Sequence, residues 1–239
     1  MFASAPLRAP FAKLLMGQCA VCRQWGRGAL CADCIARYAA PQPRCARCGL
    51  RLGLPAPACG ACLREAPPHL RTVCAVDYEH PWDALIAAFK FHGRPELAKA
   101  LAQRLVAAVQ RADAPLPMLL LPVPLSPRRL AERGYNQAWE LARRAAAALK
   151  LPADATLLQR PVEQEAHQAE LTRAERLRNL QGAFMVDPRR RAALEGRHVA
   201  LVDDVMTTGA TLHQAAHALL RGGAASVQAW VLARTPDVH

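Results

Sequence analysis

The sequence contains no apolar run of about 20 residues, the length that a membrane-spanning helix needs, so we expect no transmembrane segment. Its N-terminus also lacks the apolar core of a secretory signal peptide, because Pro6, Arg8, Pro10 and Lys13 interrupt it. Both absences predict a cytoplasmic protein, and disulfide bonds are rare in the cytoplasm. Wholesale disorder is excluded as well, because 239 residues of which 52% are hydrophobic can bury the core of one large domain or two small ones.

Acidic residues are scarce in the first third of the chain. Residues 1–74 hold ten basic side chains and only two acids, Asp33 and Glu65, so this third carries +8 of the total formal charge of +12. A basic surface suits an anionic partner such as nucleic acid or a phosphate. Lysine is scarce too, with four lysines among 31 basic residues, so biased codon usage is an alternative source of the excess.

All nine cysteines lie in the same third, and eight of them form C-x-x-C pairs. The pairs are separated by eight, ten and ten residues, and Cys74 is left over. Two C-x-x-C turns complete a tetrahedral sulfur shell, which predicts two structural zinc ions; disulfides, thiol-redox chemistry and an iron–sulfur cluster are the alternatives. The eight expected ligands are Cys19, Cys22, Cys31, Cys34, Cys45, Cys48, Cys59 and Cys62.

The pairing of these cysteines can be sequential or crossed. We favour sequential pairing, in which residues 19–34 hold one ion and residues 45–62 hold the other as two small ribbons in tandem. The segment has few large apolar residues, so the metal supplies its folding energy. Eight thiolates and two Zn²⁺ ions lower the charge of the first third from +8 to about +4, which is still basic.

From residue 72 onward the sequence alternates between strand and helix patterns. Apolar runs predict strands at residues 72–78, 118–123, 183–186, 199–202 and 227–232. Helical spacing predicts helices at residues 82–89, 97–109, 136–150 and 211–220, and a Thr-x-x-Glu capping box begins another at residues 172–178. This order predicts an α/β fold with a mostly parallel sheet flanked by helices.

Residues 199–211, VALVDDVMTTGAT, occupy the place where such a sheet binds ligands, beyond the carboxyl end of a strand. Thr207, Thr208, Gly209, Ala210 and Thr211 form a turn that opens a helix, and its N–H groups and hydroxyls can hold a phosphate. The preceding acids, Asp203 and Asp204, can accept hydrogen bonds from sugar hydroxyls or hold Mg²⁺. An acid pair beside a phosphate-binding turn predicts a sugar-phosphate site.

This segment resembles the phosphoribosyl-pyrophosphate (PRPP) motif of type I phosphoribosyltransferases at every position of the motif. With the C-x-x-C pairs and the segments FKFHG, PVPLSPRRLAERGYNQA and LTRAERLRNLQGAF, the chain is similar to the ComF family along essentially its whole length. The resemblance implies a double zinc-ribbon domain at residues 1–66 and a type I phosphoribosyltransferase-like domain at residues 71–239. It also implies a role in natural competence, that is, the handling of incoming single-stranded DNA together with DNA-uptake and recombination proteins.

For the PRPP-like site, the resemblance implies that Asp203 and Asp204 hold the ribose hydroxyls and that the turn at residues 207–211 binds the 5′-phosphate. Mg²⁺ would accompany PRPP if the protein is catalytic. Residues 122–134 carry Arg128, Arg129 and Arg133, which can meet the pyrophosphate of PRPP; a solvated loop is the alternative for the first two. Residues 159–170 lie where a mobile lid would be.

Three further residues have plainer explanations. His213 and His217 share a helix face but lack a third metal ligand, so packing or surface roles are favoured. Cys74 is expected to be a small buried strand residue.

Three functions remain open: a competence factor that binds single-stranded DNA, an active PRPP-dependent transferase with an unknown acceptor, or an adaptor in a DNA-uptake complex. Nucleobase transferases carry a hood over the site, and here only the ribbons could take that place. We therefore expect the ribbons to fold over Asp203 and Asp204; ribbons that point away would count against this hypothesis.

Overall fold

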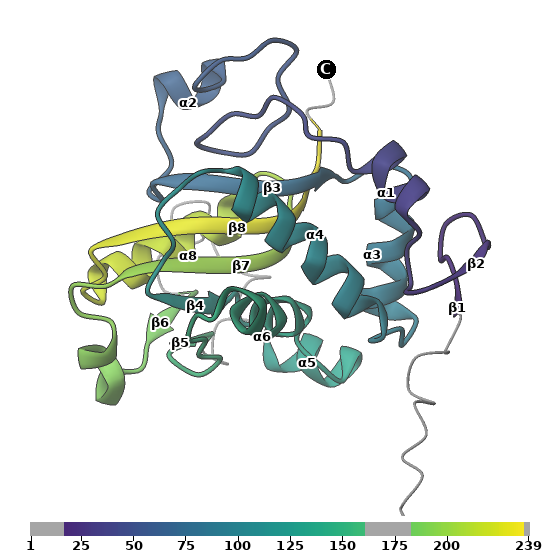
Figure 1. The fold of residues 1–239 in the computed structure, drawn as a ribbon. Coiled ribbons are helices and arrows are strands. Elements are labelled where there is room, and N and C mark those ends of the chain that lie inside the picture. The colour runs from purple at the N-terminus through teal and green to yellow at the C-terminus, as the bar shows by residue number, and fades with distance from the viewer. Residues whose placement is uncertain (1–16, 161–182, 237–239) are drawn as a thin grey trace, which may run out of the picture.

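A computed structural model describes residues 17–160 and 183–236 of the chain (Figure 1). The predicted helix at residues 172–178 and nearly all of the predicted lid at residues 159–170 lie outside these ranges. No helix in the described ranges is long and apolar enough to cross a membrane.

The centre of the fold is a four-stranded parallel sheet with the strand order β3-β8-β7-β4. The strands are β3 (Arg71–Asp77), β4 (Leu119–Pro122), β7 (His198–Met206) and β8 (Ser226–Arg234). All four match predicted strands, because parallel strands buried on both faces read as continuous apolar runs. β7 is longer than predicted and continues to Met206, so Asp203 and Asp204 lie within the strand and not after it.

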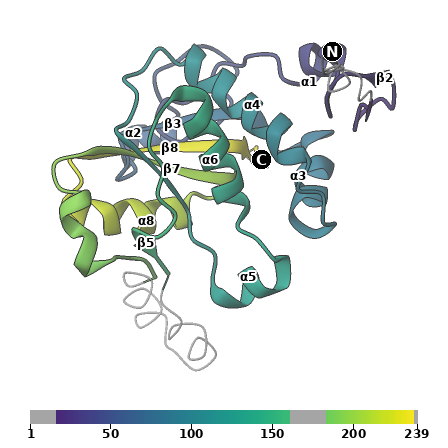
Figure 2. The same cartoon turned by 60° about the horizontal axis from the view of Figure 1, so that its bottom comes forward.

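Helices cover both faces of the sheet (Figures 1 and 2). α4 (Leu97–Arg111) and α6 (Gln137–Leu149) pack on one face, and α8 (Ala210–Arg221) packs on the other. α3 (Trp82–Phe91) precedes α4 and buries its own apolar stripe in the same core. Each helix turns its apolar stripe inward, which is why the 3.6-residue spacing predicted them. The architecture is the predicted mostly parallel α/β fold.

The segment at residues 122–134 was predicted to be a loop but contains the short helix α5 (Pro127–Arg133). The Ser126 side chain caps its first turn, Pro127 occupies the first helical position, and Gly134 ends it in the left-handed region at φ 76°. The helix buries none of its residues, so apolar periodicity could not reveal it.

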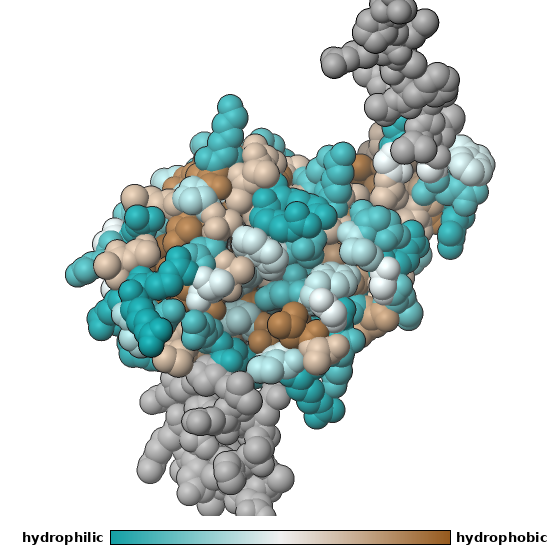
Figure 3. Space-filling view, turned by 90° about the horizontal axis from the view of Figure 1, so that it is seen from below, coloured by the Kyte–Doolittle hydropathy of each residue, from teal (hydrophilic) through white to brown (hydrophobic). Residues whose placement is uncertain are grey.

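Small elements complete the described fold. β1 (Gly17–Gln18) pairs with β2 (Trp25–Gly26) in the first ribbon, and β5 (Leu158–Gln159) pairs with β6 (Met185–Val186). α1 (Ala32–Tyr38), α2 (Gly60–Arg64) and the 3-10 helix η3 (Pro188–Ala193) are the remaining helices. Seen from the side of α5 and α6, hydrophilic residues predominate and apolar areas are scattered (Figure 3), as expected when the core is enclosed by the helices.

The cysteine-rich segment packs against the sheet domain at two places. The first ribbon contacts α3, where the Trp82 indole N–H donates to the Tyr38 carbonyl at 2.7 Å. The second ribbon lies along the edge strand β3, where the Thr72 N–H donates to the Ala46 carbonyl at 2.9 Å. A Cβ on Gly49 would come within 2.9 Å of Thr72 Cγ2, so the two backbones approach closely at that point.

Candidate functional site

The two acids of the PRPP-like motif lie near the carboxyl end of β7, where ligands bind in open α/β sheets. Asp204 is buried, and its Oδ1 atom forms an ion pair with Lys90 Nζ at 2.9 Å. Lys90 comes from the last turn of α3, which the apolar face of that helix holds against the core. Lys90 belongs to the segment FKFHG, and no role was predicted for it from the sequence. The sequence feature that could have revealed it is a lysine, one of four in the chain, between two phenylalanines.

The carboxyl group of Asp203 has a raised pKa. Its Oδ1 atom accepts a hydrogen bond from the Asp204 N–H at 2.9 Å. Burial and the neighbouring Asp204 charge raise the pKa of Asp203 to about 7, and Lys90 and Arg133 act in the opposite direction. The electrostatic influence of Arg133 on this carboxyl group places it among the charges of the site. An Asp with such a pKa changes its charge near neutral pH.

The turn that follows β7 combines exposed hydroxyls with a left-handed glycine. Thr207, Thr208 and Thr211 are exposed, and Gly209 adopts the left-handed region at φ 85° directly before α8. This φ strains any residue with a side chain, and a Cβ at Gly209 would also come within 2.6 Å of Met206 Cε and 3.0 Å of His213 Nε2, so these side chains would have to shift. Exposed hydroxyls at the positive end of a twelve-residue helix suit an anion.

Arg133 ends α5 and is held in place by two neighbours. Its Nη1 atom donates to Gln137 Oε1 at 3.0 Å, and its guanidinium lies 4.9 Å from the centre of the Phe91 ring. Arg128 pairs instead with Glu132 at 2.9 Å, and Arg129 is exposed. Of the three arginines, Arg133 is the one whose charge lowers the pKa of Asp203, whereas Arg128 and Arg129 are exposed on α5.

The cysteines form two clusters, each with four sulfur atoms within 4.8 Å of one another. The clusters follow sequential pairing: Cys19, Cys22, Cys31 and Cys34 in one; Cys45, Cys48, Cys59 and Cys62 in the other. Both clusters can hold a zinc ion.

The distances within the clusters also fit zinc. A tetrahedral ion with Zn–S bonds of about 2.3 Å places its sulfurs about 3.8 Å apart. The Cys22 and Cys31 sulfurs are 3.6 Å apart, and the Cys48 and Cys59 sulfurs are 3.7 Å apart.

Backbone N–H groups stabilise the thiolate form of one cysteine in each cluster. Burial raises the pKa of Cys19, but N–H groups of Cys22, Cys31 and Val21 outweigh it and lower that pKa to about 6. The same balance lowers the pKa of Cys45 to about 7. Cys74 stays apart as a buried strand residue, as predicted, and burial raises its pKa to about 11. Among the described residues, the two cysteine clusters are the only groups of three or more candidate metal ligands.

The second ribbon lies beside the loop at residues 207–211. The buried Arg234 connects them, because its Nε donates to the Cys48 carbonyl at 3.3 Å and its Nη1 donates to the Met206 carbonyl at 3.4 Å. A cavity of about 550 Å³ separates this ribbon from the start of α8, and Thr208, His213 and His217 line it. The second ribbon therefore adjoins the site, whereas the first ribbon packs on α3 and α4. Sequence reasoning missed Arg234 because its partners are distant along the chain.

His213 takes part in packing, as the sequence favoured. Its ring lies 5.4 Å from that of His69, which is fully buried and whose Nε2 atom lies 2.9 Å from the Thr72 hydroxyl. Burial lowers the pKa of His69 to about 4, so this ring is neutral at physiological pH. His217 is exposed at the rim of the cavity.

Comparisons with known proteins give consistent results. Residues 133–237 match the family model of the phosphoribosyl transferase domain. The chain is 38% identical over 229 residues to DNA utilization protein YhgH of Salmonella typhi, which covers 92% of this chain and 97% of that protein. It is 35% identical to competence protein F of Haemophilus influenzae, with 72% and 76% covered, and 35% identical to competence protein ComFC of Bacillus subtilis, with 63% and 58% covered.

Proposed function

The chain belongs to the ComF family, and on this premise we propose that it handles single-stranded DNA in natural transformation and binds PRPP or a related sugar phosphate. The observation that carries the sugar-phosphate proposal is the loop at residues 207–211, with three exposed hydroxyls at a helix N-terminus, next to an acid pair. The relatives named for competence and DNA utilization support the DNA proposal.

The proposed roles follow from the chemistry of each side chain. Threonine hydroxyls and N–H groups of residues 207–211 bind the 5′-phosphate, while Asp203 and Asp204 accept hydrogen bonds from the ribose hydroxyls. Lys90 keeps the buried Asp204 paired until the ligand arrives. Arg133 supplies fixed positive charge for a pyrophosphate group.

Magnesium fits this donor set, because carboxylate and phosphate oxygens are its usual ligands. When bound with PRPP, Mg²⁺ would neutralise part of the pyrophosphate charge. The zinc ions have a different role in the proposal. They fold the ribbons, and the second ribbon and Arg234 then support the loop from behind.

One observation favours catalysis as a second candidate function. The cavity of about 550 Å³ between the second ribbon and α8 adjoins the phosphate-binding loop at Thr208 and could hold an acceptor molecule. In that function, PRPP loses pyrophosphate, an acceptor attacks C1′ of the ribose, and nearby carboxylates stabilise the positive charge that develops on the ring. Release of pyrophosphate in the presence of candidate acceptors would test it.

Two calorimetric titrations of the zinc-loaded protein test the main proposal. Mg-PRPP should bind the wild type at one site and should not bind the Asp203→Asn/Asp204→Asn variant, whose circular dichroism should remain that of the wild type. Single-stranded DNA should bind with a strong salt dependence, weakened when arginines of residues 1–74 are neutralised. Binding of neither ligand would overturn the proposal and leave an adaptor role in a DNA-uptake complex.

A further inference from the structure

Two hollows follow one another along α4, between this helix and the cysteine-rich segment. The first has a volume of about 300 Å³ and lies between the α4 residues up to Arg104 and residues 27–30 of the first ribbon. The second has a volume of about 470 Å³ and lies between Ala108, Arg111 and Ala112, the segment at residues 41–46, and the edge strand β3. We call the two hollows together the α4 groove.

Cationic side chains without ionic partners line the α4 groove. They are Arg27, Lys99, Arg104, Arg71 and Arg111. Within residues 17–160 and 183–236, none of these five forms an ion pair. Among the described residues, Glu96 is the one acid that lines either hollow, and it already contacts Arg94 at 2.6 Å. The groove therefore carries a positive charge that the described residues do not neutralise.

The helix arranges part of this charge in a row. Arg104 and Arg111 are seven residues apart, so they lie on one face about two turns, or roughly 10 Å, from each other. Lys99 occupies a neighbouring row, roughly 18 Å along the axis from Arg111. The sequence of α4, LAKALAQRLVAAVQR, contains no acid that could interrupt the row.

Arg104 has a side-chain nitrogen without a hydrogen-bond partner in the described part of the chain. Its Nε atom is buried and has no hydrogen-bond partner among the described residues. Burial and the charge of Arg111 lower its pKa. A half-buried guanidinium without a counter-charge would gain from an anion beside it.

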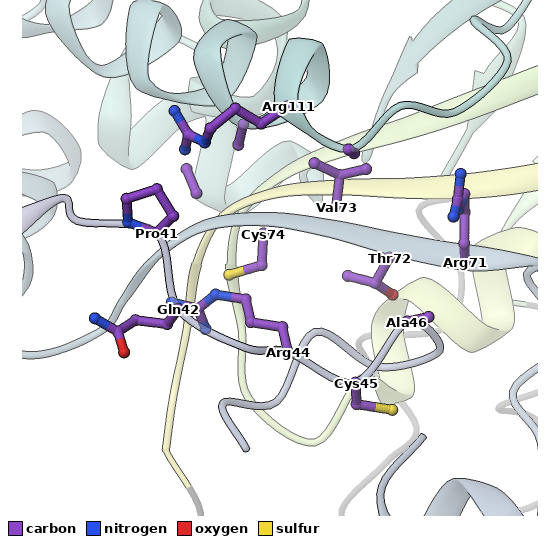
Figure 4. A pocket seen from close by; sticks show the side chains of 13 residues that line it. Pro41, Gln42, Arg44, Cys45, Ala46, Arg71, Thr72, Val73, Cys74 and Arg111 are labelled. Carbon is purple, nitrogen blue, oxygen red and sulfur yellow. The ribbon is translucent and has the colours of Figure 1, made fainter. Parts of the chain in front are cut away.

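The lining of the groove indicates which kind of anion would bind there. Figure 4 shows Arg111 extending from α4 over the second hollow toward Pro41, and Arg71 at the other end of the hollow, at the start of β3. In the part of the chain that the structure describes, no aromatic side chain lines either hollow, so the contacts there are with phosphates and not with bases. The cations that line the two hollows along α4 match the repeating phosphates of a nucleic-acid strand, and the proposed handling of single-stranded DNA specifies one flexible strand.

We propose that the α4 groove binds the phosphate backbone of single-stranded DNA, on the face of the sheet covered by α4 and α6 and apart from the loop at residues 207–211. This inference rests on the proposed DNA handling and specifies where the strand lies. The DNA contacts then come from both the ribbons and the sheet domain, so the two parts bind the strand jointly.

A matched pair of variants tests the groove. Lys99→Gln/Arg111→Gln removes two exposed charges from the groove, and Arg189→Gln/Arg197→Gln removes two charges from η3 and the segment after it. The probe is a 20-nucleotide oligo(dT), measured by fluorescence anisotropy at several salt concentrations. Circular dichroism and calorimetry with Mg-PRPP verify that each variant is folded with an intact sugar-phosphate site.

Two lost phosphate contacts should reduce the salt slope of log K by roughly 1.4 and weaken binding roughly 25-fold at 0.1 M salt. In the control variant, the change in salt slope and the change in log K should each be less than about half of the change in the groove variant. Equal losses in the two variants, or wild-type affinity in the groove variant, would overturn the groove assignment. Tighter binding of a 20-base-pair duplex than of oligo(dT) would overturn the choice of a single strand. Failure of the wild type to bind oligo(dT) would instead refute the proposed function itself.

Discussion

The ion pair between Lys90 and Asp204 should stabilise the protein in a way that depends on pH. Its atoms are 2.9 Å apart, and the side chains are only 15% and 9% exposed. At an effective dielectric constant of about 20, the attraction is about 6 kcal/mol, and desolvation of the two charges offsets much of it. Lys90→Met leaves a buried carboxylate without a counter-charge, so we expect a loss of about 3 kcal/mol at pH 8.

The pH dependence of this loss has a definite sign. In Lys90→Met, the buried carboxyl group of Asp204 has lost its counter-charge, and burial disfavours the charged form of a carboxyl group. The variant therefore loses stability as the pH rises, because at higher pH a charged carboxylate must be buried without a partner. The difference between variant and wild type should therefore be largest at pH 8 and smallest near pH 5.

Urea unfolding of the zinc-loaded protein, followed by circular dichroism, measures both effects. A double-mutant cycle with Asp204→Asn isolates the interaction, and we expect a coupling energy of about 2 kcal/mol. A coupling below about 0.5 kcal/mol, or a loss that grows as the pH falls, would refute this account of the pair.

Three further predictions concern the loop, the acid pair and the metal clusters. Gly209→Ala should cost about 1–3 kcal/mol of stability, because φ is 85° and the new Cβ meets Met206, whereas Ala210→Gly should cost less than about 1 kcal/mol; thermal unfolding compares the two. Because the pKa of Asp203 is raised to about 7, its carboxyl group becomes charged between about pH 6 and 8, and the affinity for ribose 5-phosphate should rise over this range. Calorimetry of Asp203→Asn should show a smaller rise in affinity. A rise as large as that of the wild type would contradict the role assigned to Asp203. Cys22→Ser and Cys48→Ser should each retain one zinc per chain by elemental analysis, but only Cys48→Ser should also weaken Mg-PRPP binding, since Arg234 joins the Cys48 carbonyl to the loop.

Much of the fold could be predicted because its signals are local. A buried parallel strand such as β3 is a run of apolar residues, and a helix such as α4 repeats its apolar positions every three or four residues. The sequence favoured sequential over crossed grouping of the cysteines, and the two sulfur clusters agree with it. α5 escaped prediction because it buries no residue, although its capping residues Ser126 and Gly134 were visible in the sequence.

The contacts that build the site could not be predicted in the same way. Lys90 meets Asp204, and Arg234 meets Cys48, across more than 100 residues of sequence. Such pairs depend on how α3 and the second ribbon pack against the sheet, and no local pattern encodes that packing. The α4 groove has the same origin, because its walls come from the ribbons, β3 and α4 together.

The central claim is that the loop after β7 and its acid pair bind a sugar phosphate. A crystal structure of the zinc-loaded protein with Mg-PRPP tests this most directly. We predict that the 5′-phosphate lies against residues 207–211 and that the ribose hydroxyls contact Asp203 and Asp204. A 5′-phosphate bound elsewhere, for example beside Arg71 and Arg111 in the α4 groove, would contradict the claim.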